Sequence, residues 1–132
     1  MNSNPKAQVE LFHLFFLRQF SAQIDAKLYA VKGGCNLRFF FGSVRYSEDL
    51  DLDICTIAQE TLENKINKLL GSKTLLNALQ PYGIIRLENT APKQTPTTQR
   101  WKIQLHTETA EMPYPTKIEF SRRQETIQNE FT

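Results

Sequence analysis

Three of the chain's four aspartates alternate with leucine in the run Asp49-Leu50-Asp51-Leu52-Asp53. In a β-strand, side chains alternate between the two faces, so the three carboxylates would share one face at intervals of about 6.6 Å. Like charges so close repel one another unless a cation lies among them. Oxygen ligands without nearby histidine or cysteine favour Mg²⁺, Mn²⁺ or Ca²⁺ over zinc. The run therefore predicts a strand that binds a hard divalent metal.

A glycine pair precedes the acidic run, and a further acid follows it. Gly33 and Gly34 fall between an expected strand and an expected helix, where glycines let the backbone approach a phosphate and helix amides point at the anion. Glu119 lies on the polar face of the alternating stretch 116–121. If that stretch lies beside the acidic strand, Glu119 could bind metal and accept the proton of an attacking hydroxyl. Adjacent carboxylates of this kind hold the two metals of phosphoryl transfer.

The acidic run has two other interpretations. Asp49, Asp51, Asp53 and Glu60 match positions one, three, five and twelve of an EF-hand calcium loop, although Ile54 stands where that loop requires glycine. The run could also be an acidic strand whose charges are solvated at a sheet edge. In the metal hypothesis, Asp49 and Asp51 are the ligands, and Asp53 supports them or faces solvent.

The elements expected around these residues give a small mixed β-sheet with helices packed against it, an α/β (α+β) fold. A helix over residues 5–24 would begin with Pro5 and bury a stripe of phenylalanines. Thr56 and Gln59 form a capping-box pattern for a helix that ends at Leu70. The remaining expectations are helices over 35–41 and 73–80, and strands over 28–31, 49–55, 82–87, 100–108 and 116–121.

The second half of the chain yields three further expectations. Residues 89–98 are rich in Thr, Pro and Gln and predict a mobile loop. Trp101 alternates in phase with Ile103 and Leu105, so it should be buried. Basic side chains on the late strands could form a strip that contacts a polynucleotide: Arg100, Lys102, Lys117, Arg122 and Arg123.

Length and composition indicate a single globular domain over residues 1–132. The net charge of +2 is too small to indicate nucleic-acid binding by overall electrostatics. Cys35 and Cys55 form no paired motif, and we expect both to be reduced and to fill core space. No targeting segment or membrane-length apolar run is visible, so the expected location is the cytoplasm.

Residues 31–38 (VKGGCNLR) and 45–52 (RYSEDLDL) together resemble the active-site segment of the AbiEii-type nucleotidyltransferase toxins, within the DNA polymerase β-like superfamily. Members typically show a Lys-Gly-Gly turn, a Leu-Arg pair and then Arg-x-Ser-x-Asp-x-Asp. The resemblance is specific across about 22 residues. It implies a minimal polymerase β-like nucleotidyltransferase fold.

By this resemblance, each matching residue takes the family's role. Asp49 and Asp51 match the metal-binding pair, and Glu119 resembles the third, catalytic carboxylate. The residues implied to contact the nucleotide are Lys32, Gly33, Gly34, Arg45 and Ser47. The implied cofactor is Mg²⁺ or Mn²⁺.

The resemblance also implies an activity and partners. It implies transfer of a nucleoside monophosphate from a nucleoside triphosphate to a hydroxyl of RNA, such as tRNA, or of a protein, in a toxin–antitoxin or phage-defence system with a cognate antitoxin. The family's helical C-terminal region with its Asp-x-x-Lys motif has no counterpart, because no aspartate follows Asp53. The chain therefore resembles the catalytic core only, and a catalytically inactive nucleotidyltransferase-like binding module is the alternative.

Overall fold

The computed structural model describes residues 5–31 and 49–122; residues 1–4, 32–48 and 123–132 lie outside the described part. The described part contains one five-stranded mixed sheet in the order β1-β2-β5-β4-β3. Only β2 and β5 run parallel; the other neighbours are antiparallel. The strands are β1 (Tyr29–Val31), β2 (Asp49–Ile54), β3 (Ile84–Gln94), β4 (Thr98–Thr107) and β5 (Tyr114–Arg122). The predicted mixed sheet is thus confirmed.

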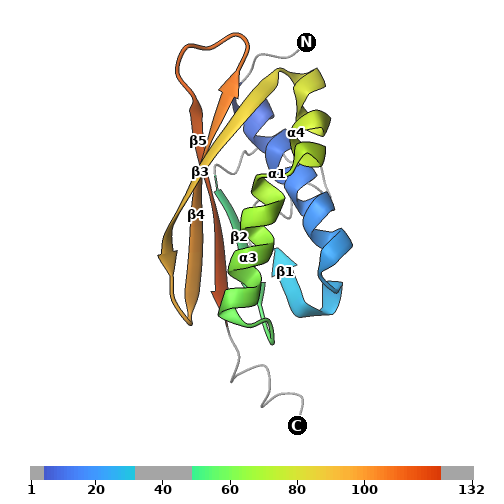
Figure 1. Ribbon diagram of the computed structural model, residues 1–132, viewed down its shortest axis with the longest axis vertical. Helices are drawn as coiled ribbons and strands as arrows, with labels where there is room; N and C mark the ends of the chain where they lie inside the picture. Colours follow the sequence, from blue (N-terminus) through green and yellow to red (C-terminus); the bar gives the residue numbers. More distant parts are fainter. Residues whose placement is uncertain (1–4, 32–48, 123–132) are drawn as a thin grey trace.

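Three α-helices in the described part lie on one side of this sheet (Figure 1). They are α1 (Pro5–Gln23), α3 (Gln59–Leu70) and α4 (Lys73–Leu79). Helix α1 contacts β5, and both α3 and α4 contact β3. The helices therefore cover one sheet face, and the polar side chains of β2, β4 and β5 project from the other.

Helix α1 forms as its phenylalanine spacing predicts. Val9, Phe12, Phe16 and Phe20 are all buried, because residues three and four apart share one face of a helix. Phe16 and Phe20 stack with ring centroids 5.9 Å apart, and Phe20 also lies 5.5 Å from the ring of Phe120 on β5. This stripe fixes α1 against the sheet.

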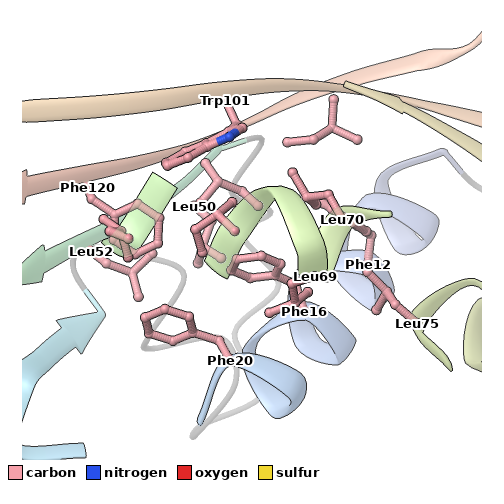
Figure 2. Packing of buried hydrophobic residues seen from close by; sticks show 14 of the residues in the cluster. Phe12, Phe16, Phe20, Leu50, Leu52, Leu69, Leu70, Leu75, Trp101 and Phe120 are labelled. Atoms are coloured by element: carbon pink, nitrogen blue, oxygen red, sulfur yellow. The ribbon is translucent and has the colours of Figure 1, made fainter. Parts of the chain in front are cut away.

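Trp101 lies at the centre of the core, as predicted (Figure 2). Its ring meets Phe120 edge-on with centroids 5.8 Å apart, and its Nε1 donates a hydrogen bond of 2.9 Å to Oδ1 of Asn67 on α3. Leu50 and Leu52 of β2 are also fully buried here. Packing in the core therefore holds β2, β4 and β5 in place. The side of these strands that faces away from the core carries the acidic and basic residues.

The predicted mobile loop over residues 89–98 is wrong. Strand β3 extends to Gln94 and forms a long hairpin with β4. Threonine favours strands, and the register shift between Thr90 and Lys93 accommodates Pro92, which is tolerated because β3 is an edge strand. The reversal itself is short, with Thr95 N–H and hydroxyl both donating to the Thr98 carbonyl at 2.9 Å.

The predicted capping box is also wrong. Ala58 is the N-cap of α3 and makes no side-chain cap hydrogen bond. Gln59 instead donates its side-chain amide to the Gln94 carbonyl at 2.9 Å, and Thr56 donates its hydroxyl to the Cys55 carbonyl. Tertiary contact with the hairpin therefore replaces the local cap.

Two expectations about cysteine and membrane crossing can be compared with the described residues. Cys55 is a free thiol, but it is half-buried rather than in the core, and Cys35 lies outside the described part. Within residues 5–31 and 49–122, none of the helices combines the length and apolar character that a bilayer crossing requires.

A buried histidine joins α1 to β5. His13 is almost completely buried, and its Nε2 lies 2.8 Å from the hydroxyl oxygen of Thr116. Burial disfavours the charged imidazolium and lowers the pKa of His13 to about 3, from 6.5. The folded protein therefore keeps this ring neutral across the mildly acidic range.

We expect His13 to make folding stability depend on pH between about 3 and 6.5. Below pH 6.5 the unfolded chain takes up a proton that the folded state does not, so stability falls as pH falls. The contribution is about 2 kcal/mol of unfolding free energy between pH 7 and pH 5. Denaturant unfolding at both pH values should show that His13→Gln reduces the pH dependence by this amount. The matched control His106→Gln should retain the His13 contribution, and an unchanged pH slope in His13→Gln would contradict the assignment.

Candidate functional site

The acidic run forms strand β2 with its carboxylates on one face, as predicted. Leu50, Leu52 and Ile54 are buried against the helices, whereas Asp51 is exposed and Asp49 and Asp53 are partly exposed. The alternation therefore separates a core face from an acidic face.

Glu119 of β5 lies on the same face, directly beside Asp51. The two strands run parallel with Asp51 and Glu119 as Cα partners, and Asp49 is the partner of Lys117. Partners on neighbouring strands lie about 4.8 Å apart and project to the same side. The condition set in the sequence analysis, that the Glu119 strand lies beside the acidic strand, is therefore met; the catalytic role of these residues stays a prediction.

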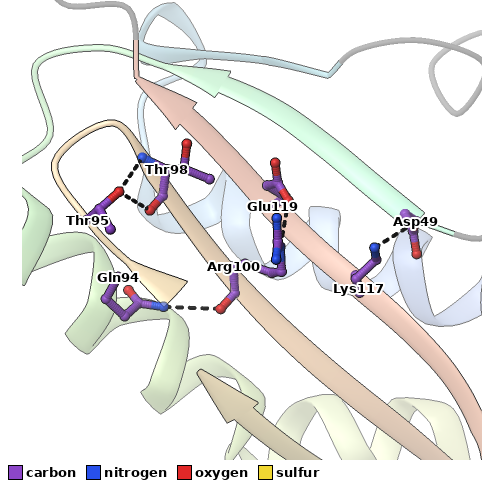
Figure 3. Close-up of polar contacts among 7 residues, drawn as sticks. All are labelled: Asp49, Gln94, Thr95, Thr98, Arg100, Lys117 and Glu119. Atoms are coloured by element: carbon purple, nitrogen blue, oxygen red, sulfur yellow. Dashed lines mark hydrogen bonds and ion pairs between the residues drawn. The ribbon is translucent and has the colours of Figure 1, made fainter. Parts of the chain in front are cut away.

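Two ion pairs engage these carboxylates (Figure 3). Arg100 of β4 donates from Nε to Oε1 of Glu119 at 2.8 Å, and both side chains are about 30% exposed. The ammonium of Lys117 lies 3.6 Å from Oδ2 of Asp49, and both of these side chains are more exposed. The first pair is the stronger, because it is a short charge-assisted hydrogen bond in a partly desolvated setting.

A hollow of about 480 Å³ opens beside Asp49 on this face. Its lining includes Lys102, Gln104 and Lys117, which supply two ammonium groups and an amide. Lys102 and Lys117 are Cα partners on adjacent strands, an arrangement in which like charges repel. An anion in this hollow would relieve that repulsion.

The residues predicted to contact the nucleotide lie outside the described part of the chain: Lys32, Gly33, Gly34, Arg45 and Ser47. Their nearest described neighbours in sequence are Val31 and Asp49. Val31 ends β1 and is the Cα partner of Leu52 on β2. The predicted glycine turn therefore follows, in sequence, a strand that adjoins the acidic one.

The carboxylates of Asp49, Asp51 and Glu119 have the chemistry that a hard divalent cation requires, because they offer charged oxygen donors alone. Across residues 5–31 and 49–122, however, no three acidic, histidine or cysteine side chains are positioned together as a metal site. Oε1 of Glu119 accepts a hydrogen bond from Arg100. The donor types fit Mg²⁺ or Mn²⁺, but the described side chains do not assemble them into a metal site.

The EF-hand interpretation of the acidic run is wrong, because Asp49–Ile54 is a strand within a sheet and Glu60 belongs to α3. The sheet-edge position in the second interpretation is also wrong, because β2 lies between β1 and β5. Whether the acidic strand has a purely structural role stays an open alternative.

The predicted basic strip is partly wrong. Arg100, Lys102 and Lys117 do share the acidic face of the sheet. Arg122 does not, because it is in register with buried Ile54 and its guanidinium donates to the carbonyls of Ile57 and Pro96. Arg123 lies outside the described part.

Sequence reasoning missed the ion pair between Arg100 and Glu119. The residues are 19 positions apart and meet only because β4 pairs with β5. The only sequence signal for this ion pair is that Arg100 and Glu119 carry opposite charges on the polar faces of two expected strands. That signal identifies a contact only when the register between β4 and β5 is known.

Comparisons with known proteins agree with this fold. A family model described as nucleotidyl transferase AbiEii toxin, type IV toxin–antitoxin system, matches residues 16–131. A search of curated proteins found no match. The fold is similar to a Helicobacter pylori protein proposed to be a nucleotidyltransferase, with a TM-score of 0.63 and 24% identity over 91% of this chain and 46% of that one. It is also similar to JHP933 from Helicobacter pylori, with a TM-score of 0.62 and 21% identity over 93% and 46% of the two chains. The chain thus spans about half the length of these structures.

Proposed function

Because the chain belongs to the AbiEii nucleotidyl transferase toxin family, we propose that it moves a nucleoside monophosphate from a nucleoside triphosphate to an acceptor hydroxyl. The acceptor oxygen forms a bond to the α-phosphorus, the bond to the bridging oxygen breaks, and pyrophosphate leaves with that electron pair. The observation that carries the proposal is the register of β2 and β5, which aligns Asp51 with Glu119 and leaves Asp49 on the same face.

In this proposal each site residue has a role. Asp49, Asp51 and Glu119 would hold Mg²⁺ or Mn²⁺, which when bound would neutralise charge on the phosphate oxygens. Glu119 also accepts the proton of the attacking hydroxyl. Contacts to the triphosphate come from Lys32, Gly33, Gly34, Arg45 and Ser47.

The wider setting is part of the proposal. The family is a type IV toxin–antitoxin family, which supports a cognate antitoxin as partner. The acceptor is an RNA end, such as that of tRNA, or a protein hydroxyl. We place the reaction in the cytoplasm, where triphosphates and RNA are abundant, and in phage defence.

A second candidate is a binding module that holds metal and nucleotide without transfer. The observation in its favour is that Glu119, the proposed proton acceptor, is already engaged in an ion pair with Arg100.

Label transfer distinguishes the two candidates. The purified protein is incubated with each α-labelled triphosphate, Mg²⁺ and total tRNA, beside Asp51→Asn and a chelated reaction. Label on tRNA, or on protein, that requires both Mg²⁺ and Asp51 supports the enzyme. Mg²⁺-dependent nucleotide binding without transfer supports the module, and neither binding nor transfer would contradict both.

A further inference from the structure

The hollow beside Asp49 lies on two paired strands. Lys102 of β4 is the Cα partner of Lys117 of β5, and two residues along, Gln104 is the partner of Pro115. Residues two apart on a strand share a face, so these four side chains border one space. Its volume of about 480 Å³ lies within the range of about 300–1,000 Å³ that is typical of small-ligand sites.

The two lysines give this space a positive character. Side chains directly opposite each other on antiparallel strands have Cβ atoms about 4.5–5.5 Å apart, where like charges destabilise the pair. Within residues 5–31 and 49–122, Lys102 makes no ion pair. An anion held between the two ammonium groups would therefore be attracted by both and would relieve their repulsion.

Asp49 compensates the charge of Lys117 only in part. The ammonium of Lys117 lies 3.6 Å from Oδ2 of Asp49, and the two side chains are 42% and 41% exposed (Figure 3). An ion pair this exposed is weak, and an ammonium group has three N–H donors, so Lys117 can contact Asp49 and an anion together. Two lysines and one aspartate line the hollow, which leaves its lining with a net charge of +1 (2 − 1).

Phosphate is the anion that these groups match best. Its tetrahedral oxygens can accept hydrogen bonds from Lys102, Lys117 and the side-chain amide of Gln104 at once, whereas a carboxylate offers two oxygens in one plane. The ring of Pro115 adds apolar surface to the lining, against which the sugar or base of a nucleotide can pack. The hollow therefore fits a nucleotide held by its phosphate.

We propose that Lys102, Lys117 and Gln104 form a phosphate-binding site in this hollow, which holds a nucleotide without a metal ion. The phosphate belongs either to a free nucleotide or to one unit of an RNA strand, and both present the same anionic oxygens. This site goes beyond the proposed function, because it requires neither a metal nor a transfer reaction.

The first test is phosphate binding to the purified protein in EDTA. Tripolyphosphate, followed by titration calorimetry, represents a free nucleotide, and a labelled oligoribonucleotide, followed by fluorescence anisotropy, represents an RNA strand. Lys102→Gln and Lys117→Gln should each weaken binding about five- to tenfold, because each loses a charge-assisted hydrogen bond. Gln104→Leu should weaken it about two- to fivefold.

The responses of the two probes identify the source of the phosphate. Weaker binding of tripolyphosphate alone indicates a free nucleotide, weaker binding of the oligoribonucleotide alone indicates an RNA strand, and weaker binding of both indicates a site that accepts either. If neither probe binds, or if neither responds to the lysine variants, the proposal is overturned.

A substitution of opposite sign sharpens this test. Asp49→Asn removes the acid that lines the hollow and releases Lys117, so phosphate binding in EDTA should tighten about two- to fivefold. A variant that lost core structure would bind more weakly instead. Weaker phosphate binding in Asp49→Asn would therefore contradict the proposal.

Matched controls separate a local contact from a general electrostatic effect. Arg86→Gln removes one positive charge from β3, where Arg86 is paired with Glu88 and does not line the hollow. Lys68→Gln removes one positive charge from α3, on the side of the sheet that the helices cover (Figure 1). Each should change phosphate affinity by less than about twofold. Weakening equal to that of Lys102→Gln would overturn the proposal, and circular dichroism confirms that each variant is folded.

Salt dependence tests whether the contact is to phosphate when the oligoribonucleotide is the ligand. Each phosphate contact on a single strand contributes about 0.7 to the slope of log K against log salt concentration. Lys102→Gln should therefore lower the magnitude of this slope by about 0.7, whereas Lys68→Gln should leave it unchanged. Weaker binding with an unchanged slope in Lys102→Gln would contradict a phosphate contact.

Failure of this proposal can be told apart from failure of the proposed function, because its measurements exclude metal and transfer. Mg²⁺-dependent label transfer by a protein whose phosphate binding in EDTA ignores Lys102 and Lys117 would overturn the phosphate site alone. Phosphate binding that depends on both lysines, in a protein without transfer activity, would support the site and contradict only the proposed function.

Discussion

Asp51→Asn is expected to lower the rate of label transfer about a thousandfold or more while the protein stays folded. Asp51 is exposed and lies beside Glu119, so its loss removes a metal ligand but no core contact. Metal charge stabilisation supplies several kcal/mol, and each 1.36 kcal/mol is a factor of ten in rate. Single-turnover transfer and denaturant unfolding measure the two effects.

Asp53→Asn is the matched control on the same strand and face. Asp53 is aligned with Ser121 rather than with Glu119, so its carboxylate belongs to the next row of the sheet. The transfer rate of this variant should stay within about tenfold of the unmodified protein, because no metal ligand is lost. Equal losses in Asp51→Asn and Asp53→Asn would contradict the assignment of Asp49 and Asp51 as the metal pair.

Trp101→Ala is expected to lower the free energy of unfolding by about 3–5 kcal/mol. The side chain is fully buried, so the substitution leaves a large cavity between the sheet and α3. Total stability for a domain of this size is about 5–15 kcal/mol, so the variant would be close to unfolding. Denaturant unfolding followed by circular dichroism measures the loss.

Two variants separate the hydrogen bond from the cavity. Asn67→Leu removes the acceptor of Trp101 Nε1 and leaves a buried N–H unpaired, which costs about 1–3 kcal/mol. Trp101→Phe loses the same bond and part of the ring, and its loss should lie between those of the other two. A loss below about 1 kcal/mol in Trp101→Ala would contradict the central position of this residue in the core.

The spacing of apolar residues predicted the helices and strands in which buried side chains recur at regular intervals. Leu50 and Leu52 alternate with acids, and Phe12, Phe16 and Phe20 recur at helical spacing, so each pattern reports a buried face directly. The β3–β4 hairpin was not predicted, because its strand over residues 89–94 is an exposed edge with little apolar signal.

The candidate site could be predicted only in part, for a different reason. The shared face of Asp49, Asp51 and Asp53 follows from spacing within one strand. The position of Glu119 beside Asp51 and the position of Arg100 beside Glu119 depend on the strand order, with β5 between β2 and β4. Such pairing joins residues distant in sequence, and no local pattern specifies it.

The most direct test of the account is a crystal structure of the protein with Mn²⁺ and a non-hydrolysable nucleoside triphosphate. The account predicts an anomalous scattering peak within coordination distance of oxygens from Asp49, Asp51 and Glu119. A peak distant from these carboxylates, with triphosphate bound elsewhere, would contradict the claim that they form one metal site.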